Sequence, residues 1–166
     1  MSLTALVCVG LDNAIGGENK LLWYLPEDLK NYKKLTSGGY LVVGRKTYDS
    51  LPEVAKKNRF HYVISSKSGI NDITRKYFNT IDEFLEYQQT MYDSEIFVIG
   101  GQQIYEQLIR HCTKAIITTV CGFYPEADKF FPMHEISCGF NEISSTGKLK
   151  SKTGLEYVIR EYVRTI

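Results

Sequence analysis

Residues 21–36 read LLWYLPEDLKNYKKLT, and one acid within this stretch guides the interpretation of the whole chain. Pro26 suits the first turn of a helix, because its φ is fixed and its missing N–H would have no partner there. At 100° per residue, the apolar stripe of this helix consists of Leu25, Leu29, Tyr32 and Leu35. Asp28 lies inside that stripe, whereas its neighbour Glu27 points away from it. The pattern therefore predicts a helix that directs one carboxylate toward the interior.

Two explanations for Asp28 compete. An acid in the first turn complements the positive end of the helix dipole, and this accounts for its position along the helix. It does not account for the face, because a carboxylate aimed at a core is costly unless a partner compensates it. Acids with perturbed environments in clefts mark functional sites, so the sequence favours a functional carboxylate at Asp28.

The bulk composition is that of an ordinary globular protein. The chain has 166 residues, 43% hydrophobic and 23% charged, which suits a single domain spanning residues 1–166. Its net charge is +1, from 20 basic and 19 acidic residues. Such a balance predicts no bulk attraction to nucleic acid or to a membrane surface.

Cysteine usage indicates a reducing compartment. The four cysteines, none of which belongs to a C-x-x-C pair or has a histidine at metal-ligand spacing, are Cys8, Cys112, Cys121 and Cys138. Free thiols are typical of cytoplasmic proteins, and no metal site is predicted. The first ten residues lack the features of a signal peptide, and no apolar run has membrane-spanning length. We therefore expect a cytoplasmic protein.

Apolar runs alternate with helical patterns along most of the chain. Buried strands are predicted at Leu3–Val9, Tyr40–Val43, Phe60–Ile64, Arg75–Phe78, Ile96–Ile99 and Ala115–Cys121. Between these strands, a helix is expected from Pro26 to Thr36, and a brief one after Gly44-Arg45-Lys46-Thr47 that ends at Leu51-Pro52. Two more helices are expected, one after the capping box Thr80-Ile81-Asp82-Glu83 and one after Gly100-Gly101. This alternation predicts right-handed crossovers and a mostly parallel sheet.

Two segments depart from the alternation. Phe140–Thr146 and Leu155–Val163, joined by the polar Gly147–Gly154, indicate a terminal antiparallel hairpin at the sheet edge. Gly10–Lys20 is glycine-rich and long for a connection, and loops of this kind tend to be lids. The predicted fold is α/β, a single domain with a mostly parallel central sheet flanked by helices and a C-terminal antiparallel hairpin.

Three predicted strands end in residues that suit an anionic ligand. These ends are Gly44-Arg45-Lys46-Thr47, Ser65-Ser66-Lys67 and Gly100-Gly101-Gln102. Ligands of open α/β sheets bind beyond the carboxyl ends of the strands, and a helix N-terminus there favours phosphate. Each signal alone is weak, since Gly-Gly is also a turn and Arg45-Lys46 also a solvated pair. Together they favour a dinucleotide with an extra phosphate, as in NADP(H).

The chain resembles the dihydrofolate reductase family along nearly all of its length. The residues that carry the resemblance are Ala14–Asn19, Trp23–Leu29, Val43–Tyr48 with Ser50, Val63–Ser66, Val98–Tyr105 and Ala127–Pro132. The resemblance implies reduction of 7,8-dihydrofolate to 5,6,7,8-tetrahydrofolate, with hydride from NADPH added at C6 and a proton at N5. It also implies that Gly10–Lys20 closes over the reacting rings and that burial raises the pKa of Asp28.

The resemblance assigns roles on the substrate side. Asp28 matches the carboxylate that hydrogen-bonds the pterin, and Thr118 the hydroxyl that supports it. Trp23 matches the residue that helps to place a water near that acid, and Tyr105 would lie against the nicotinamide ring. Arg59 aligns with the arginine that pairs with the α-carboxylate of the glutamate tail. The wall around the pterin and aminobenzoyl rings is matched by Leu6, Leu29, Tyr32, Leu51 and Ile99.

The resemblance also assigns the cofactor contacts. Cys8 and Ile15 would meet the nicotinamide carboxamide through their backbones, and the family's Gly-Gly peptide is cis. The other expected contacts are Gly16, Asn19, Lys20, Leu21, Gly44, Arg45, Lys46, Thr47, Ser65, Ser66, Lys67, Gly100, Gly101, Gln102, Gln103, Ile104 and Tyr105. The chain departs from the family pattern at Leu22, Tyr48 and Glu53–Asn58, where the family usually has a Pro, a Trp and a Pro-rich turn.

Two other readings remain open. A related NADPH-dependent pyrimidine reductase of riboflavin synthesis shares the sheet and the cofactor site, but it is not expected to combine Trp23, Asp28 and Arg59. An inactive binding or structural module has no reason to keep a buried acid. For the enzyme, we expect a monomer with dihydrofolate as its small-molecule partner and a functional link to thymidylate synthase without a stable complex. His61, His111 and His134 are interpreted as structural.

Overall fold

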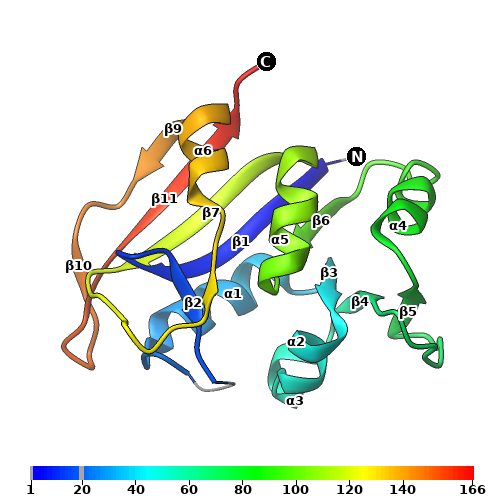
Figure 1. Ribbon diagram of the computed structural model, residues 1–166, viewed down its shortest axis with the longest axis horizontal. Coiled ribbons are helices and arrows are strands. Elements are labelled where there is room, and N and C mark those ends of the chain that lie inside the picture. Colours follow the sequence, from blue (N-terminus) through cyan, green and yellow to red (C-terminus); the bar gives the residue numbers. More distant parts are fainter. Residues whose placement is uncertain (1, 19–20) are drawn as a thin grey trace.

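The computed structural model describes residues 2–18 and 21–166, which form a mixed α/β fold around one large sheet (Figure 1). The strands of this sheet are β1 (Ser2–Gly10), β3 (Tyr40–Gly44), β4 (Phe60–Ile64), β5 (Arg75–Phe78), β6 (Glu95–Val98), β7 (Cys112–Val120), β9 (Phe140–Ser145), β10 (Leu149–Lys150) and β11 (Glu156–Arg164). A separate two-stranded sheet consists of β2 (Ala14–Gly16) and β8 (Lys129–Phe130).

The sheet order is β10-β11-β7-β1-β6-β3-β4-β5, with β9 also paired to β11. From β7 to β5 every neighbouring pair is parallel, as the alternation of strands and helices predicts. The antiparallel hairpin of β9 and β11 is confirmed. It is not simply an edge, however, because β11 lies between β7 on one side and β9 and β10 on the other.

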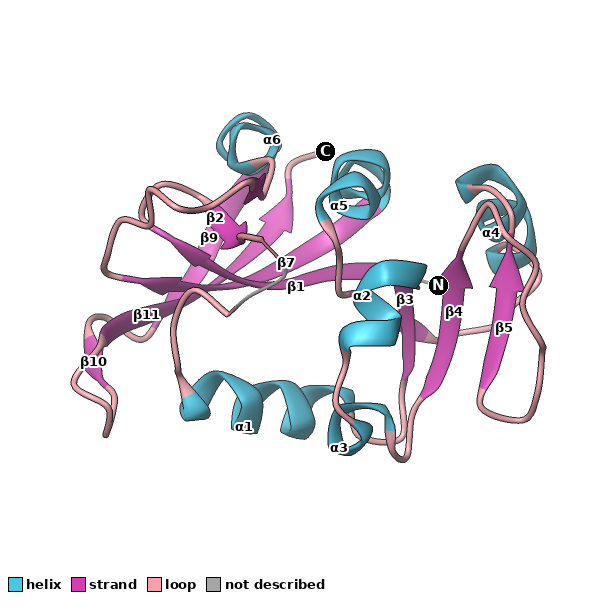
Figure 2. Cartoon of the chain, turned by 60° about the horizontal axis from the view of Figure 1, so that its bottom comes forward, coloured by secondary structure: helices cyan, strands magenta, loops and turns pink. Residues whose placement is uncertain are grey.

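Helices cover both faces of the sheet. Their bounds are α1 (Pro26–Thr36), α2 (Arg45–Ser50), α3 (Glu53–Lys56), α4 (Ile81–Gln88), α5 (Gln102–Leu108) and α6 (Met133–Gly139), and a 3-10 turn spans Ile109–His111. Figure 2 shows α1 on one side of the sheet and α4, α5 and α6 on the other. None of the helices in the described ranges is long and apolar enough to cross a membrane.

The central strands read as apolar runs because helices pack on both of their faces. Ala5 and Val9 of β1, Val42 of β3 and Val98 of β6 are fully buried in the larger core cluster. Leu108 of α5 and Phe84 of α4 seal the same cluster from the helical side. The packed sheet gives the site a rigid floor.

Several elements of the structure differ from the predicted ones, because their limits depend on contacts between segments that are distant in the sequence. Gly10–Lys20 is not wholly a loop, since Ala14–Gly16 forms β2 against β8. The helical face predicted after Gly100-Gly101 extends to Cys112, but Cys112 already belongs to β7. Three further elements, α3, α6 and β8, are only two to seven residues long, which is too short for a periodic pattern to predict them.

The predicted capping box before α4 is present, and it gives a test of the local sequence signals. The Thr80 side chain accepts a hydrogen bond from the Glu83 N–H at 3.2 Å, and Glu83 Oε2 accepts one from the Asn79 N–H at 2.9 Å. We expect Thr80→Ala to lower the free energy of unfolding by about 1 kcal/mol, since an orphan N–H loses its partner. Urea denaturation measures this. Thr80→Ser keeps the hydroxyl and should stay close to wild type; an equal loss in both variants would contradict the capping role.

Candidate active site

Asp28 lies in the first turn of α1, and its carboxyl group is largely removed from water. Its backbone N–H donates to the Leu25 carbonyl at 3.0 Å, which anchors the turn behind Pro26. Burial raises the pKa of Asp28 to about 6, while hydrogen bonds from Thr118 and Cys8 act in the opposite direction. The carboxyl group can therefore hold a proton near neutral pH.

The neighbouring acid is used differently. Glu27 accepts a hydrogen bond from Ser151 Oγ at 2.7 Å and one from the Lys152 N–H at 3.0 Å. These contacts lower the pKa of Glu27 and tie the start of α1 to the segment before β11. The two adjacent carboxylates thus face apart, as the angular argument from the sequence predicts.

Two strands supply the side chains around Asp28. Cys8 of β1 and Thr118 of β7 are register partners, so their side chains stand beside each other on one face of the sheet. Thr118 is 1% exposed and hydrogen-bonds Asp28. Burial and the Asp28 charge raise the pKa of the Cys8 thiol. The thiol is a contact of Asp28 that was not predicted, because Cys8 was interpreted as a small buried hydrophobic residue and the resemblance implies only a backbone role for it.

Trp23 and Tyr105 reach this region from opposite sides of the fold. The Trp23 ring packs on Tyr124 with centroids 4.9 Å apart, in the same apolar cluster as Cys8. The Tyr105 hydroxyl donates to the Leu6 carbonyl at 2.7 Å, and its ring meets the edge of Phe131 at 5.0 Å. Burial raises the pKa of Tyr105 far above its ordinary value, so the phenol stays neutral.

The predicted apolar wall is largely brought together. Leu6, Tyr32 and Ile99 belong to one cluster, and Ile99 also packs in a second cluster with Leu51. Leu29 is 40% exposed and joins neither cluster among the described residues. The stripe of α1 is thus not a fully buried core face: Thr36 is fully buried, whereas Asp28 as a whole residue is half-buried although its carboxyl group is largely removed from water. An apolar side chain left open beside a buried carboxyl group is what a ligand-binding cleft presents.

Arg59 is fixed at the end of α1. Its Nε donates to Thr36 Oγ1 at 2.7 Å and one terminal nitrogen donates to the Lys33 carbonyl at 3.0 Å. Its guanidinium carbon lies 5.3 Å from the centroid of the Tyr32 ring. None of the ion pairs in the described part of the chain includes Arg59, so its charge is available for an anionic ligand.

The backbone of Gly100 and Gly101 forms the other half of the site. Their peptide bond is cis, as the resemblance implied, and the Gly44 N–H donates to the Gly100 carbonyl at 2.9 Å. A Cβ on Gly101 would lie 3.1 Å from Thr47 Oγ1, and one on Gly100 would lie 3.1 Å from the Tyr105 ring. A side chain at either position would force its neighbour to shift, and the positive φ of Gly100 (111°) also favours glycine.

The helices that follow have glycine caps. Gly44 precedes α2 and Gly101 precedes α5, and neither cap carries a side chain that bonds the first N–H groups. Both helix N-termini follow the carboxyl ends of β3 and β6, which are adjacent parallel strands, and dinucleotides bind at such strand ends. Of the predicted contacts in α5, Ile104 is buried, Gln102 accepts from the Phe130 N–H at 2.9 Å, and Gln103 is exposed.

The basic and hydroxyl groups predicted for phosphate lie around the same strand ends. Arg45 pairs with Asp49 at 3.0 Å and is partly exposed, Lys46 is exposed, and Thr47 is half-buried. Ser65 is buried and its hydroxyl accepts from the Lys67 N–H at 3.1 Å, whereas the Ser66 and Lys67 side chains are exposed. These strand ends therefore present cations to solvent, with one buried hydroxyl between them.

The segment that follows β1 is tethered to the chain between β7 and α6. Asp12 Oδ2 accepts from the Tyr124 N–H at 2.8 Å, and the Asp128 N–H donates to the Gly16 carbonyl at 3.0 Å. Ile15 in β2 packs against the main core, and Leu21 is 89% exposed. The predicted contacts Asn19 and Lys20 lie outside the described residues. The contacts of Asp12 were not predicted, because its only local signal is an acid two residues after Gly10.

Comparison with known proteins gives a consistent result. The family model for dihydrofolate reductase matches residues 2–164. A dihydrofolate reductase from Staphylococcus aureus (strain MSSA476) is 32% identical over 164 residues, which cover 99% of each chain. One from Buchnera aphidicola is 38% identical over 141 residues, or 84% of each chain.

A solved structure agrees with the sequence relatives. A dihydrofolate reductase from Enterococcus faecalis, complexed with NADP(H) and RAB-propyl, superimposes with a TM-score of 0.85 at 25% identity, covering 99% of this chain and 97% of that chain. Sequence and fold agree over nearly the full length. The chain belongs to the dihydrofolate reductase family.

Proposed function

We propose how this chain carries out the reaction of its family, the NADPH-dependent reduction of 7,8-dihydrofolate to 5,6,7,8-tetrahydrofolate. The observation that carries the proposal is a largely buried carboxyl group, Asp28, that is hydrogen-bonded to Thr118 and Cys8. In the same fold, Leu6, Tyr32 and Ile99 form one apolar cluster. The two alternatives from the sequence, a pyrimidine reductase of riboflavin synthesis and an inactive module, are not favoured by the family match.

Asp28 orients and polarises the pterin. Its carboxyl group can accept from an N–H and an amino group of the ring, which supply the partners that a buried acid needs. With a pKa of about 6, it is protonated in part of the molecules near neutral pH. It can thus help deliver a proton toward N5 through water, whose placement we assign to Trp23. Thr118 holds the carboxyl group in orientation.

The strand ends would hold NADPH. The glycine-capped starts of α2 and α5 suit a diphosphate, and the close approach of Gly100 and Gly101 leaves no room for a side chain there. Arg45, Lys46, Ser65, Ser66 and Lys67 suit the additional phosphate. When bound, the cofactor supplies the hydride that is added to C6. Tyr105, buried and neutral, would form one wall of the nicotinamide site.

Backbone groups of the protein would also contact the cofactor. The carbonyl and N–H groups of Cys8 and Ile15 would meet the nicotinamide carboxamide. We propose that the described part of the segment after β1 closes over the rings while β2 stays paired with β8. Closure would exclude water and strengthen the electrostatic action of Asp28.

Arg59 is proposed to bind the α-carboxylate of the substrate's glutamate tail. Arg59→Lys is expected to raise the KM for dihydrofolate roughly tenfold and to leave kcat within about twofold, because lysine cannot form the bidentate pair and the tail is remote from the chemistry. Steady-state kinetics with varied dihydrofolate measures this. A dihydropterin that lacks the carboxylate tail serves as the control and should be reduced equally by both proteins; a fall in kcat alone would contradict the assignment.

We also propose that the enzyme is a cytoplasmic monomer. All four cysteines are free, two of them half-buried, one buried and one exposed. This suits a reducing compartment. Light scattering on the purified chain measures the mass directly, and a value of twice 19.0 kDa would contradict the monomer.

A further inference from the structure

A cavity of about 860 Å³ lies beside α3, away from the cofactor strand ends. Its lining includes the first residues of β4 and the start of β5, namely Phe60, His61 and Arg75. The cofactor contacts, by contrast, follow the carboxyl ends of β3 and β4. The cavity is therefore at the opposite end of the same strands and belongs to a different site.

The cavity is strongly cationic. Its lining residues, all in the described part of the chain, contain four cations against a single carboxylate: Lys56, Lys57, Arg59 and Arg75 against Glu53. The net charge of the whole protein is only +1, so positive charge is concentrated here. Glu53 does little to compensate it, because its side chain is 93% exposed and lies 3.7 Å from Lys56.

Aromatic walls intensify this field. Tyr48 is buried, and Lys56 Nζ lies 4.5 Å from the centroid of its ring. Tyr40 and Phe60 line the cavity as well, with ring centroids 6.1 Å apart. A cleft lined by charges of one sign with low-dielectric walls focuses its field and concentrates counter-ions.

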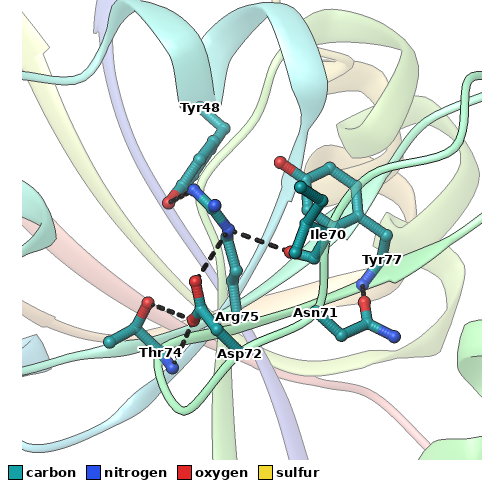
Figure 3. A network of polar contacts seen from close by, with 7 residues as sticks. All are labelled: Tyr48, Ile70, Asn71, Asp72, Thr74, Arg75 and Tyr77. Carbon is teal, nitrogen blue, oxygen red and sulfur yellow. Dashed lines mark hydrogen bonds and ion pairs between the residues drawn. The ribbon is translucent and has the colours of Figure 1, made fainter.

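Arg75 is held in place by a local network (Figure 3). Its Nε lies 3.2 Å from the Ile70 carbonyl and 3.2 Å from Asp72 Oδ2, and a terminal nitrogen lies 3.5 Å from the Tyr48 hydroxyl. Asp72 is fixed in turn by the Thr74 N–H at 2.7 Å and the Thr74 hydroxyl at 2.6 Å. A pre-organised guanidinium binds an anion without the entropic cost of ordering a mobile side chain.

The pKa of the buried His61 reflects the positive potential of the cavity. Its side chain is 1% exposed and packs against the Tyr48 ring at 5.1 Å. Its Nε2 is buried and has no hydrogen-bond partner among the described residues. Burial, with Lys56 and Arg59 nearby, lowers the pKa of His61 to about 4. The imidazole thus stays neutral beside the positive charges of Lys56 and Arg59.

We propose that this cavity is a second anion-binding site, which takes a small multivalent anion with closely spaced phosphate or carboxylate groups. Multivalence follows from the arrangement: Lys56 lies over the Tyr48 ring, whereas Arg75 approaches the hydroxyl of the same residue. A ligand between them meets cations from α3 and from β5. A single charge would leave the others uncompensated.

Arg59 couples the two sites, an inference that rests on its proposed role toward the substrate tail. It lines the cavity and is also fixed to the end of α1 through Thr36. An anion in the cavity would compete for its charge and repel the tail carboxylate. The KM for dihydrofolate should therefore rise, and kcat should not change.

The test measures the binding of inorganic pyrophosphate, and in a parallel arm citrate, to the whole protein at constant ionic strength maintained with sodium chloride. Calorimetry gives the affinity, and the His61 ring signals in NMR report the location. Lys56→Gln/Lys57→Gln removes two cations, of which Lys56 contacts the Tyr48 ring and Glu53. Arg75→Gln is a second, independent variant. Arg110→Gln/Lys114→Gln removes the same number of charges from exposed positions elsewhere.

We expect binding in wild type, a rise in the pKa of His61 on binding, and affinity at least roughly tenfold weaker in Lys56→Gln/Lys57→Gln, since each lost contact to a charged group is worth that factor. The Arg110→Gln/Lys114→Gln control should bind as wild type does. Preference for pyrophosphate or for citrate identifies the ligand as a phosphate or a carboxylate.

Equal affinity in wild type and both cavity variants would overturn the site, because binding would then be non-specific. These measurements need no turnover, so they stand even if dihydrofolate is not the substrate. The kinetic arm follows KM with added pyrophosphate, and an unchanged KM at saturating anion would overturn the coupling through Arg59 alone.

Discussion

Asp28→Asn is expected to reduce turnover of dihydrofolate at neutral pH by a factor of about 100 or more. An amide at this position cannot hold or relay a proton, and general acid–base catalysis by a positioned side chain contributes roughly 10²–10⁴-fold. The loss should appear mainly in kcat. As the pH falls, the variant should recover part of its activity, because the substrate itself is then protonated more often in solution. The decrease in NADPH absorbance measures the rate.

The matched control is the neighbouring acid. Glu27 bonds Ser151 and the Lys152 N–H and does not face the cleft, so Glu27→Gln should stay within about twofold of wild type. Equal turnover in wild type and Asp28→Asn would contradict the catalytic role of Asp28. Absence of turnover in the folded wild-type protein would contradict the proposed reaction.

The same substitution is expected to stabilise the protein at alkaline pH. The pKa of Asp28 is raised from 3.8 to about 6 in the folded state, so the folded protein binds the proton more tightly than the unfolded chain does. Its stabilising contribution is complete below pH 3.8 and is lost as the pH rises through about 6. Two pKa units correspond to about 3 kcal/mol. Asn, which does not titrate, removes this dependence.

Urea denaturation of both proteins at several pH values measures the effect. The difference in unfolding free energy between Asp28→Asn and wild type should change by about 2 kcal/mol in favour of the variant between pH 4 and pH 8. Glu27→Gln should show the opposite trend, because the pKa of Glu27 is lowered and its ion contributes stability as the pH rises. A pH-independent difference for Asp28→Asn would mean that its carboxyl group is not buried in solution.

If Asp28→Asn gains stability and loses activity, the carboxyl group of Asp28 contributes to catalysis and not to the stability of the free protein. A carboxyl group in an apolar cleft destabilises the free protein and becomes useful only when the ligand supplies its partners. A purely structural acid would lose stability on the same substitution.

The local pattern of the sequence determined the central features of the fold. The bounds of β4 and β5 agree with the predicted runs at Phe60–Ile64 and Arg75–Phe78, and α1 begins at Pro26 and ends at Thr36 as predicted. These elements are set by periodicity, by a proline and by glycines, all of which act within a few residues. The side of α1 on which Asp28 lies follows from the same 100° geometry.

Short elements and partners distant in sequence were not accessible in this way. α3 is four residues long, and it is held to α1 by the Tyr32 hydroxyl, which donates to the Ala55 carbonyl at 3.0 Å. The two residues are 23 positions apart in the sequence. β2 exists only because β8, more than a hundred residues later, pairs with it. Neither strand has enough residues to alternate visibly between buried and exposed positions.

The sequence by itself thus determined which carboxylate turns inward, and tertiary structure decided what surrounds it. The register of β1 against β7 sets Cys8 beside Thr118 under Asp28, and a shift of one residue would turn both side chains to the other face. The Lys33 carbonyl and the Thr36 hydroxyl at the end of α1 fix Arg59, and the amino ends of β4 and β5 bring His61 and Arg75 to one cavity. Such neighbours depend on strand pairing across long separations, which a local pattern does not encode.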